Sequence, residues 1–156
     1  MARVYLEISF IGYLTSRLSR DLIVAGHQQI TQEWWDTRRT QFELYISRIV
    51  IDESGAGDEQ AAGERLAILR DLPVLQLTPE AVELAKALVT PGAFPQECQE
   101  DALHVAVAAV NGMDFLLTWN CRHIANAQIG RVAASICEAE GYQMPVICTP
   151  EELTGE

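Results

Sequence analysis

Residues able to bind a metal ion recur at the places where a parallel α/β sheet would bring them together. Glu7 and Asn120 each follow a short apolar segment that predicts a buried strand. Asp101 opens a helical stretch, and Glu53 lies on the helix expected after the second strand. The carboxyl ends of parallel strands lie along one edge of a sheet, where ligands bind. We therefore expect these side chains to converge at that edge.

The chemistry that suits such a cluster is the binding of a divalent cation. Carboxylates gathered at one place repel one another unless a cation offsets their charge. Oxygen ligands favour Mg²⁺ or Mn²⁺, whereas zinc prefers nitrogen and sulfur. We expect Glu7, Glu53 and Asp101 to bind the metal through their carboxylates. Asn120 would add an uncharged oxygen, as a weaker or water-mediated ligand.

The segment 101–126 contains the elements that would position Asp101 and Asn120. Its first part has small apolar residues at the three- and four-residue spacing of a helix with one buried face, namely Ala102, Val105, Ala106 and Ala109. Asn111 and Gly112 predict the end of this helix, because both tolerate the left-handed conformation. The apolar run 115–117 then predicts a strand covered on both faces.

The remaining segments alternate between apolar runs and helical patterns. Strands are expected at 4–6, 44–46, 74–77 and 145–148. Helices are expected from a Ser19 cap to about residue 39, from a Ser47 cap to Gly55, over 58–71 with Ala62, Leu66 and Leu69 inward, from a Thr78 cap to Pro91–Gly92, and over 127–140. This alternation predicts an α/β fold, a parallel sheet of about four to five strands flanked by helices. No linker or repeat interrupts it, so we expect a single domain over 1–156.

Length and composition fit a globular protein without membrane or export segments. The 156 residues are 49% apolar, and no apolar stretch approaches the ~20 residues of a membrane span. Glu7 interrupts the apolar start and no small-residue cleavage site follows, so we expect no secretion signal. The cysteines, at 98, 121, 137 and 148, lack metal-finger spacing. We expect them to be reduced thiols in a cytoplasmic protein.

The net charge of −11 restricts the partners that the chain can attract through its overall field. A field of this sign repels nucleic acid and anionic lipid surfaces. It suits a cation site or a basic protein partner instead.

Four sequence motifs resemble those of one known family. They are Val-Tyr-Leu-Glu-Ile-Ser at 4–9, Ile-Asp-Glu at 51–53, Glu-Asp-Ala-Leu-His-Val-Ala at 100–106 and Leu-Leu-Thr-Trp-Asn at 116–120. In this order they resemble the PIN domain family of metal-dependent ribonucleases, which includes the VapC-type toxins of bacterial toxin–antitoxin pairs. The match covers nearly the whole chain and implies the PIN-like three-layer sandwich. Glu7 and Asn120 depart from it, since the family usually has aspartate at both places.

The resemblance implies an activity and a set of residues that perform it. The implied activity is hydrolysis of RNA phosphodiester bonds with Mg²⁺ or Mn²⁺ as cofactor. The implied catalytic and metal-binding residues are Glu7, Glu53, Asp101 and Asn120, and Ser9 and Thr118 match supporting hydroxyls beside the metal. The implied partners are RNA, an antitoxin protein and a second copy of the chain in a homodimer, with no membrane.

An RNA-binding protein of this charge needs a local basic rim near its active site. Our candidates are Arg17, Arg20 and Arg122, because short loops should connect them to the strand ends that carry Glu7 and Asn120. Arg38 and Arg39 lie farther along the chain.

Other interpretations of these residues stay open at the level of sequence. Asp101 in a first helical turn would also complement the helix dipole, Glu53 is also typical of a solvated helix, and His104 is typical of a hydrogen-bonded structural histidine. A receiver-type phosphorylation domain also gathers acids at strand ends, but it needs a lysine after its last strand, and Lys86 lies inside a helix. The remaining alternative is a PIN fold that has lost activity and serves as a protein- or RNA-binding module.

Overall fold

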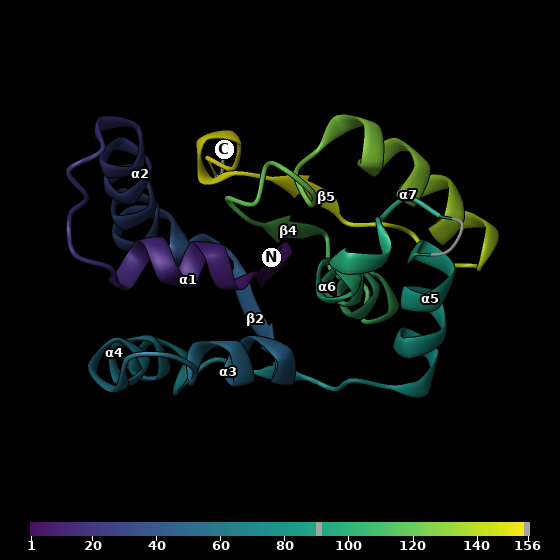
Figure 1. Cartoon of the computed structure of the whole chain (residues 1–156), viewed down its shortest axis with the longest axis horizontal. Coiled ribbons are helices and arrows are strands. Elements are labelled where there is room, and N and C mark those ends of the chain that lie inside the picture. Colours follow the sequence, from purple (N-terminus) through teal and green to yellow (C-terminus); the bar gives the residue numbers. More distant parts are fainter. Residues whose placement is uncertain (90–91, 155–156) are drawn as a thin grey trace.

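A computed structural model describes residues 1–89 and 92–154 of the chain. Its centre is a sheet of five parallel strands in the order β3-β2-β1-β4-β5 (Figure 1). The strands are β1 (Arg3–Leu6), β2 (Glu43–Ser47), β3 (Val74–Leu75), β4 (Phe115–Leu117) and β5 (Val146–Cys148). The predicted α/β class and parallel sheet are confirmed.

Helices cover both sides of this sheet and complete a three-layer sandwich. The α-helices are α1 (Ile8–Thr15), α2 (Leu22–Arg38), α3 (Arg48–Ser54), α4 (Glu59–Leu69), α5 (Pro79–Val89), α6 (Gln99–Val110) and α7 (Ala127–Ala139). Three short 3-10 helices are η1 (Arg39–Gln41), η2 (Gln96–Cys98) and η3 (Pro150–Glu152). In Figure 1, α1, α2 and α4 lie to the left of the strands, α3 lies below β2, and α5 to α7 lie to the right. Helix α1 packs against α2, α3 and α4, whereas α5 packs against α6 and α7.

Strand β1 is the middle of the sheet and carries its most buried residues. Val4, Tyr5 and Leu6 are fully buried, with Val4 paired to Leu44 on one side and Phe115 on the other. The backbone N–H of the next residue, Glu7, donates to the carbonyl of Leu117 on β4 (3.1 Å). The ends of β1 and β4 are therefore held together just where the polar residues begin.

Helix α1, which follows β1 directly, was not predicted from the sequence. Residues 8–15 are almost continuously apolar and follow the strand without a turn residue, so periodicity alone does not separate strand from helix there. The next helix also begins later than predicted, because Asp21 caps α2 by accepting from the N–H groups of Ile23 and Val24. The hydroxyl of Ser19 instead accepts from the N–H of Asp21 (3.1 Å).

Two further expectations differ from the structure, and one falls outside it. Leu66 was expected to face the core, but it is 39% exposed. In α4, only Ala62 and Leu69 are buried. The strand expected at 74–77 has only two residues, and Leu77 is 43% exposed at this edge of the sheet. Pro91 lies outside the described residues.

The signals for helix ends perform as predicted at several places. Gly112 has a φ of +71° after α6, and the hydroxyl of Thr78 accepts from the N–H of Ala81 at the start of α5. Asn111 keeps a negative φ of −90°. No helix in the described part of the chain is long and apolar enough to cross a membrane.

We predict opposite stability effects for alanine at two glycines. Gly112→Ala should lower the free energy of unfolding by about 1–2 kcal/mol, because its φ of +71° strains a residue with a Cβ. Gly63→Ala is the matched control, in the exposed interior of α4 with no atom within 4 Å of the added Cβ. It should raise the free energy of unfolding by about 0.5–1 kcal/mol. Urea unfolding monitored by circular dichroism measures both values, and equal effects at the two positions would contradict the assigned turn.

Candidate metal-binding active site

The carboxylate of Glu7 is the most buried acid of the site. Glu7 occupies the N-cap position between β1 and α1, and the residue is only 2% exposed. Its Oε1 accepts hydrogen bonds from the hydroxyls of Ser9 and Thr118, the latter at 2.5 Å. A buried carboxylate is strongly disfavoured without such donors. The two hydroxyls therefore fix the position of the Glu7 side chain.

Ser9 and Thr118 are themselves held by the chain that follows β4. The backbone N–H of Trp119 donates to Ser9 Oγ (2.8 Å), and the N–H of Asn120 donates to Thr118 Oγ1 (2.9 Å). Each hydroxyl thus accepts from the backbone and donates its one proton to Glu7. This pairing places the turn after β4 against the start of α1 and brings the two predicted supporting hydroxyls to the same carboxylate.

A second buried network holds Glu53. His104 on α6 places Nε2 at 2.8 Å from Glu53 Oε1, with the histidine side chain 1% and the Glu53 side chain 23% exposed. On its other side, His104 Nδ1 lies 2.6 Å from the hydroxyl of Tyr5, which is 2.7 Å from the hydroxyl of Ser47. The chain Ser47–Tyr5–His104–Glu53 connects β2, β1, α6 and α3. His104 is a hydrogen-bonded structural residue in this network.

The ionisation of this network follows from burial and from the nearby acids. Burial by itself would lower the pKa of His104, but the hydrogen bond and charge of Glu53 outweigh it, with further contributions from Glu7 and Asp101. The pKa of His104 is therefore raised above its usual value. Burial likewise raises the pKa of Tyr5 far above that of a free phenol, so Tyr5 keeps its proton. The raised pKa of His104 favours its protonated form beside Glu53, whereas the Tyr5 hydroxyl stays neutral.

The third acid, Asp101, is connected to Asn120. Asp101 lies in the first turn of α6 with its side chain 20% exposed, and its Oδ1 accepts from Asn120 Nδ2 (3.2 Å). Asn120 Oδ1 accepts from the backbone N–H of His123 (3.1 Å). The amide therefore presents its nitrogen to Asp101 and its oxygen to the following turn. Asn120 reaches the predicted site, and its donor group offsets part of the charge of Asp101.

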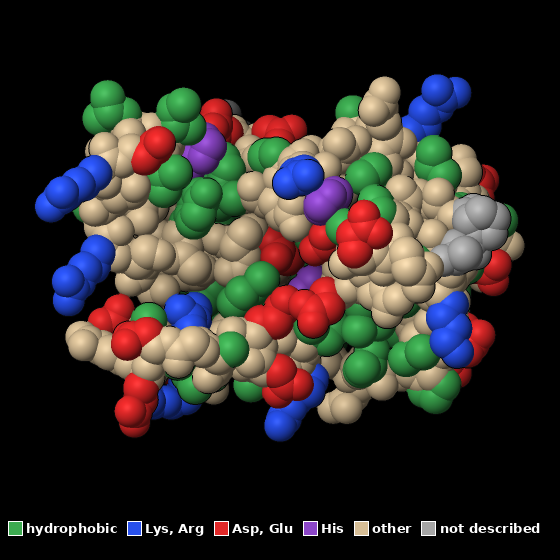
Figure 2. All heavy atoms as spheres, viewed as in Figure 1, with side chains coloured by type: hydrophobic (Ala, Val, Ile, Leu, Met, Phe, Trp, Pro, Cys, Tyr) green, Lys and Arg blue, Asp and Glu red, His purple; other side chains and the backbone are tan. Residues whose placement is uncertain are grey.

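Hydrogen bonds connect Glu7 and Asp101 through Thr118 and Asn120 at the carboxyl edge of the sheet, and Glu53 is bound to His104 nearby. The charges of Glu7, Glu53 and Asp101 all act on the single buried His104. Figure 2 shows acidic side chains beside histidines at the middle of this face, with most Lys and Arg side chains toward its margins. The oxygen donors suit Mg²⁺ or Mn²⁺. Among the described residues, these acids do not form a trio with ligand atoms within 4.8 Å of one another. A shared ion would reach all of them after side-chain rotation or through water, which Mg²⁺ usually retains.

One cluster at this edge is missing from the sequence-based expectation. Cys98, Asp101 and His123 bring a sulfur, an oxygen and a nitrogen within 4.8 Å of one another. The spacing of Cys98 and Asp101 places them one helical turn apart, but nothing in the sequence links either of them to His123. The pKa of the Cys98 thiol is raised by desolvation and by the charges of Asp101 and Glu97.

The arginines predicted to contact RNA occupy two different places. Arg122 lies in the turn directly after Asn120, and its charge acts on the Cys98 thiol. Arg17 and Arg20 are exposed in the segment between α1 and α2, at the far left of Figure 1. The short loop assumed between Glu7 and these two arginines is wrong, because the eight residues of α1 intervene, about 12 Å of helix.

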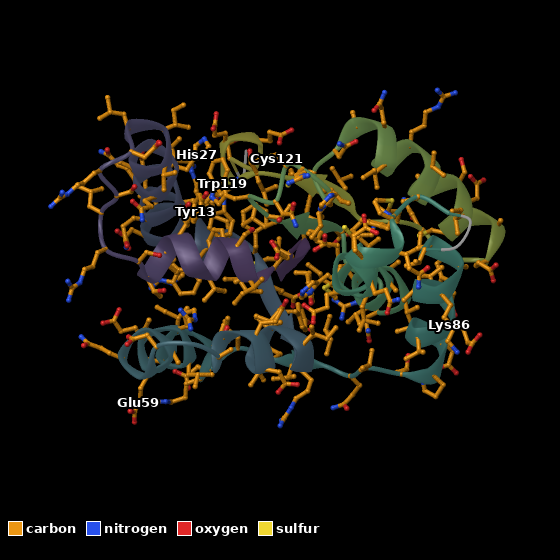
Figure 3. All side chains as sticks on the ribbon, viewed as in Figure 1. Tyr13, His27, Glu59, Lys86, Trp119 and Cys121 are labelled. Atoms are coloured by element: carbon orange, nitrogen blue, oxygen red, sulfur yellow. The ribbon has the colours of Figure 1, made fainter. Side chains whose placement is uncertain are left out.

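Three stacked rings form a further surface beside the site. The ring centroids of His27 and Trp119 lie 4.1 Å apart at 14°, and Tyr13 stacks at 6.0 Å from Trp119. Figure 3 shows these rings together, from α1, α2 and the turn after β4. The Trp119 Nε1 donates to the hydroxyl of Thr31 (2.7 Å), which fixes the indole. No pattern of residue spacing predicts this stack, because its three rings come from distant segments of the chain.

Comparisons with known proteins agree with the arrangement of the strands and helices. No protein-family model matches the chain, and no curated protein sequence matches it. Among solved structures, the chain is similar to Mycobacterium tuberculosis VapC20, a sarcin–ricin loop cleaving toxin, with a TM-score of 0.61 and 16% identity over 78% of this chain and 93% of that one. It is also similar to VapBC2 from Rickettsia felis bound to a DNA fragment of its promoter, with a TM-score of 0.57 and 14% identity over 94% of this chain and 98% of that one.

We predict that Glu53→Gln lowers the pKa of His104. The substitution removes the negative charge that favours the imidazolium and leaves only a neutral amide oxygen as acceptor, so the opposing effect of burial gains weight. The histidine resonances in an NMR pH titration of the metal-free protein measure this pKa. Asp52→Asn is the matched control, because Asp52 is exposed and pairs with Arg48 at 3.4 Å. An equal effect of the two substitutions would contradict the assigned Glu53–His104 pair.

Proposed function

From the VapC-type PIN-domain fold that the chain shares with these structures, we propose that the protein is a divalent-metal-dependent endoribonuclease. We further propose that it is the toxin of a toxin–antitoxin pair. The observation that carries the proposal is the hydrogen-bonded chain Glu7–Thr118–Asn120–Asp101 at the carboxyl edge of the sheet, together with Glu53 held by His104. The similar VapC20 is a toxin that cleaves the sarcin–ricin loop, which supports RNA as the substrate class.

The carboxylates of Glu7, Glu53 and Asp101 are the residues that would hold Mg²⁺ or Mn²⁺. Such an ion lowers the pKa of water from about 15.7 toward about 7 and offsets charge that develops on the phosphoryl oxygens. Asn120 adds no charge, so three formal negative charges would face the ion in place of four. The side chain of Glu7 is one methylene longer than the usual aspartate, and its hydroxyl partners hold it in place.

The surrounding residues orient these carboxylates and admit the substrate. His104 fixes Glu53 through a hydrogen bond, and its raised pKa favours the imidazolium beside that carboxylate. Ser9 and Thr118 orient Glu7, since both donate their protons to it. Arg122, in the turn beside Asn120, is the basic group best placed to attract a phosphate into this acidic centre.

The antitoxin and homodimer parts of the proposal rest on different support. The similar VapBC2 structure is a complex bound to promoter DNA, which supports an antitoxin as the partner of this chain. A net charge of −11 favours a partner segment rich in lysine and arginine. A homodimer follows from the resemblance to VapC-type toxins and is proposed on that ground.

A second candidate function is a PIN fold without catalysis that binds protein or RNA. The observation that favours it is the hydrogen bond from Asn120 Nδ2 to Asp101 Oδ1. With aspartate at position 120, two carboxylates would face each other and need a cation between them. With asparagine, the pair is stable without one. The two candidates differ in whether Mn²⁺ binds and whether RNA is cleaved.

We predict that charge at two positions controls Mn²⁺ affinity. Asp101→Asn should weaken Mn²⁺ binding by at least about 100-fold and abolish RNA cleavage, because a charged ligand is lost. Asn120→Asp should strengthen Mn²⁺ binding by about tenfold, equal to about 1.4 kcal/mol, and raise cleavage at low metal concentration. Isothermal titration calorimetry and cleavage of a single-stranded RNA measure the two quantities.

The neighbouring Glu100 supplies the control for these substitutions. Glu100 is exposed on the same helical turn, so Glu100→Gln should leave both quantities near those of the wild type. An unchanged isotherm for Asp101→Asn would remove Asp101 from the metal site. If the wild type binds no Mn²⁺ and cleaves no RNA, the binding-module function replaces the enzyme.

We predict that Arg122→Glu weakens binding of single-stranded RNA and flattens its dependence on salt. Each lost phosphate contact should reduce the slope of log affinity against log salt by about 0.7. Arg20→Glu should have the smaller effect, because helix α1 separates Arg20 from the acids. Fluorescence anisotropy across a salt series measures the slopes, with Arg131→Glu on exposed α7 as a control of equal charge change. Equal slopes for all three variants and the wild type would show that this basic rim is misplaced.

A further inference from the structure

Cys98, Asp101 and His123 form a compact cluster of three different ligand types. Cys98 ends η2 and is 7% exposed, Asp101 lies in the first turn of α6, and His123 comes from the turn after β4. Cys98 Sγ lies 3.4 Å from His123 Nδ1, and Asp101 Oδ2 lies 3.4 Å from the same nitrogen. All three atoms lie within 4.8 Å of one another.

The arrangement is not that of a nucleophilic triad. A Cys-His-Asp triad uses the two ring nitrogens separately, one toward the sulfur and the other toward the carboxylate. Here the sulfur and the carboxylate oxygen face the same nitrogen, and the Cys98 thiol also interacts with Asp101. All three ligand atoms are therefore directed at one another, as they would be around a shared cation.

The distances agree with those around a tetrahedral zinc ion. Zinc bonds of about 2.3 Å to sulfur and about 2.0–2.2 Å to nitrogen and oxygen, at tetrahedral angles, place sulfur about 3.5 Å and oxygen about 3.4 Å from the nitrogen. The observed separations from Nδ1 are 3.4 Å in both cases. We propose that Cys98, Asp101 and His123 form a binding site for Zn²⁺ or a similar thiolate-binding divalent cation, with the fourth position open to solvent.

Asn120 is a positioning residue for this site. Its Oδ1 holds the backbone N–H of His123, and its Nδ2 holds Asp101 Oδ1, so Asp101 Oδ2 is the oxygen directed at His123. Partners of this kind orient metal ligands. Binding would release the thiol proton of Cys98 to solvent as sulfur forms its bond to the ion.

The site differs in chemistry from the proposed ribonuclease centre. It uses sulfur and nitrogen donors, which zinc prefers, whereas the acids Glu7 and Glu53 offer oxygen alone. The two sites share Asp101 and its partner Asn120. Substitutions at Cys98 and His123 therefore separate them, since neither residue belongs to the carboxylate set.

Titration of the full chain, without an added histidine tag, with Co²⁺ tests the proposal under anaerobic conditions. The thiolate-to-cobalt charge-transfer absorption of the wild type should saturate at one equivalent of Co²⁺. Added Zn²⁺ should displace the cobalt ion and remove the absorption. Cys98→Ser should abolish this absorption, and His123→Ala should weaken Co²⁺ and Zn²⁺ binding by at least about 100-fold. Both variants should keep the Mn²⁺ affinity of the wild type. The experiment therefore distinguishes failure of the zinc-site proposal from failure of the nuclease proposal.

Cys121→Ser is the matched control, because Cys121 is an exposed thiol in the same turn and is labelled in Figure 3. It should keep the full absorption. Absence of the band in the wild type would overturn the site, and so would a band that Cys121→Ser removes and Cys98→Ser leaves. Because His123 is on the surface turn, His123→Ala tests the site even if Cys98→Ser unfolds. An unchanged affinity in His123→Ala would also overturn it.

Discussion

The burial of the Glu7 carboxylate is the constraint on which the rest of the site depends. A carboxylate that is 2% exposed at the end of the central strand costs several kcal/mol unless nearby donors compensate for lost water. The hydroxyls of Ser9 and Thr118 supply those donors. Their own positions require that α1 start directly after Glu7 and that the chain after β4 turn back against it. The junction of β1, α1 and β4 is thus built around one negative charge.

The other acids are attached to the same junction through partners of their own. His104 connects Glu53 to Tyr5 on the central strand, and Asn120 connects Asp101 to the turn after β4. Each acid therefore has a hydrogen-bond donor of its own in the metal-free protein. These donors reduce the repulsion among the three negative charges, so the fold holds the acids together before any cation binds. The same donors also limit how far each carboxylate can move toward an ion.

The sequence predicts the parts of this arrangement that depend on local pattern. Apolar runs with polar residues at their ends identify β1, β4 and the positions of Glu7 and Asn120, and capping residues identify α5 and the end of α6. Helix α1 escapes prediction because its mostly apolar residues follow β1 without a turn residue and lack a clear helical period. Contacts between distant segments escape for a different reason. The cluster of Cys98 with His123 and the stack of Trp119 on His27 depend on tertiary folding and have no signature in residue spacing.

The most direct test of the central claim is the position of Mn²⁺ in crystals of the wild-type protein. Anomalous scattering from manganese locates the ion without reference to activity or to any substitution. We predict an anomalous peak among the carboxylate oxygens of Glu7, Glu53 and Asp101, at direct or water-mediated distance. A manganese peak only at other residues, or no peak at saturating Mn²⁺, would contradict the claim that these acids form a divalent-metal site.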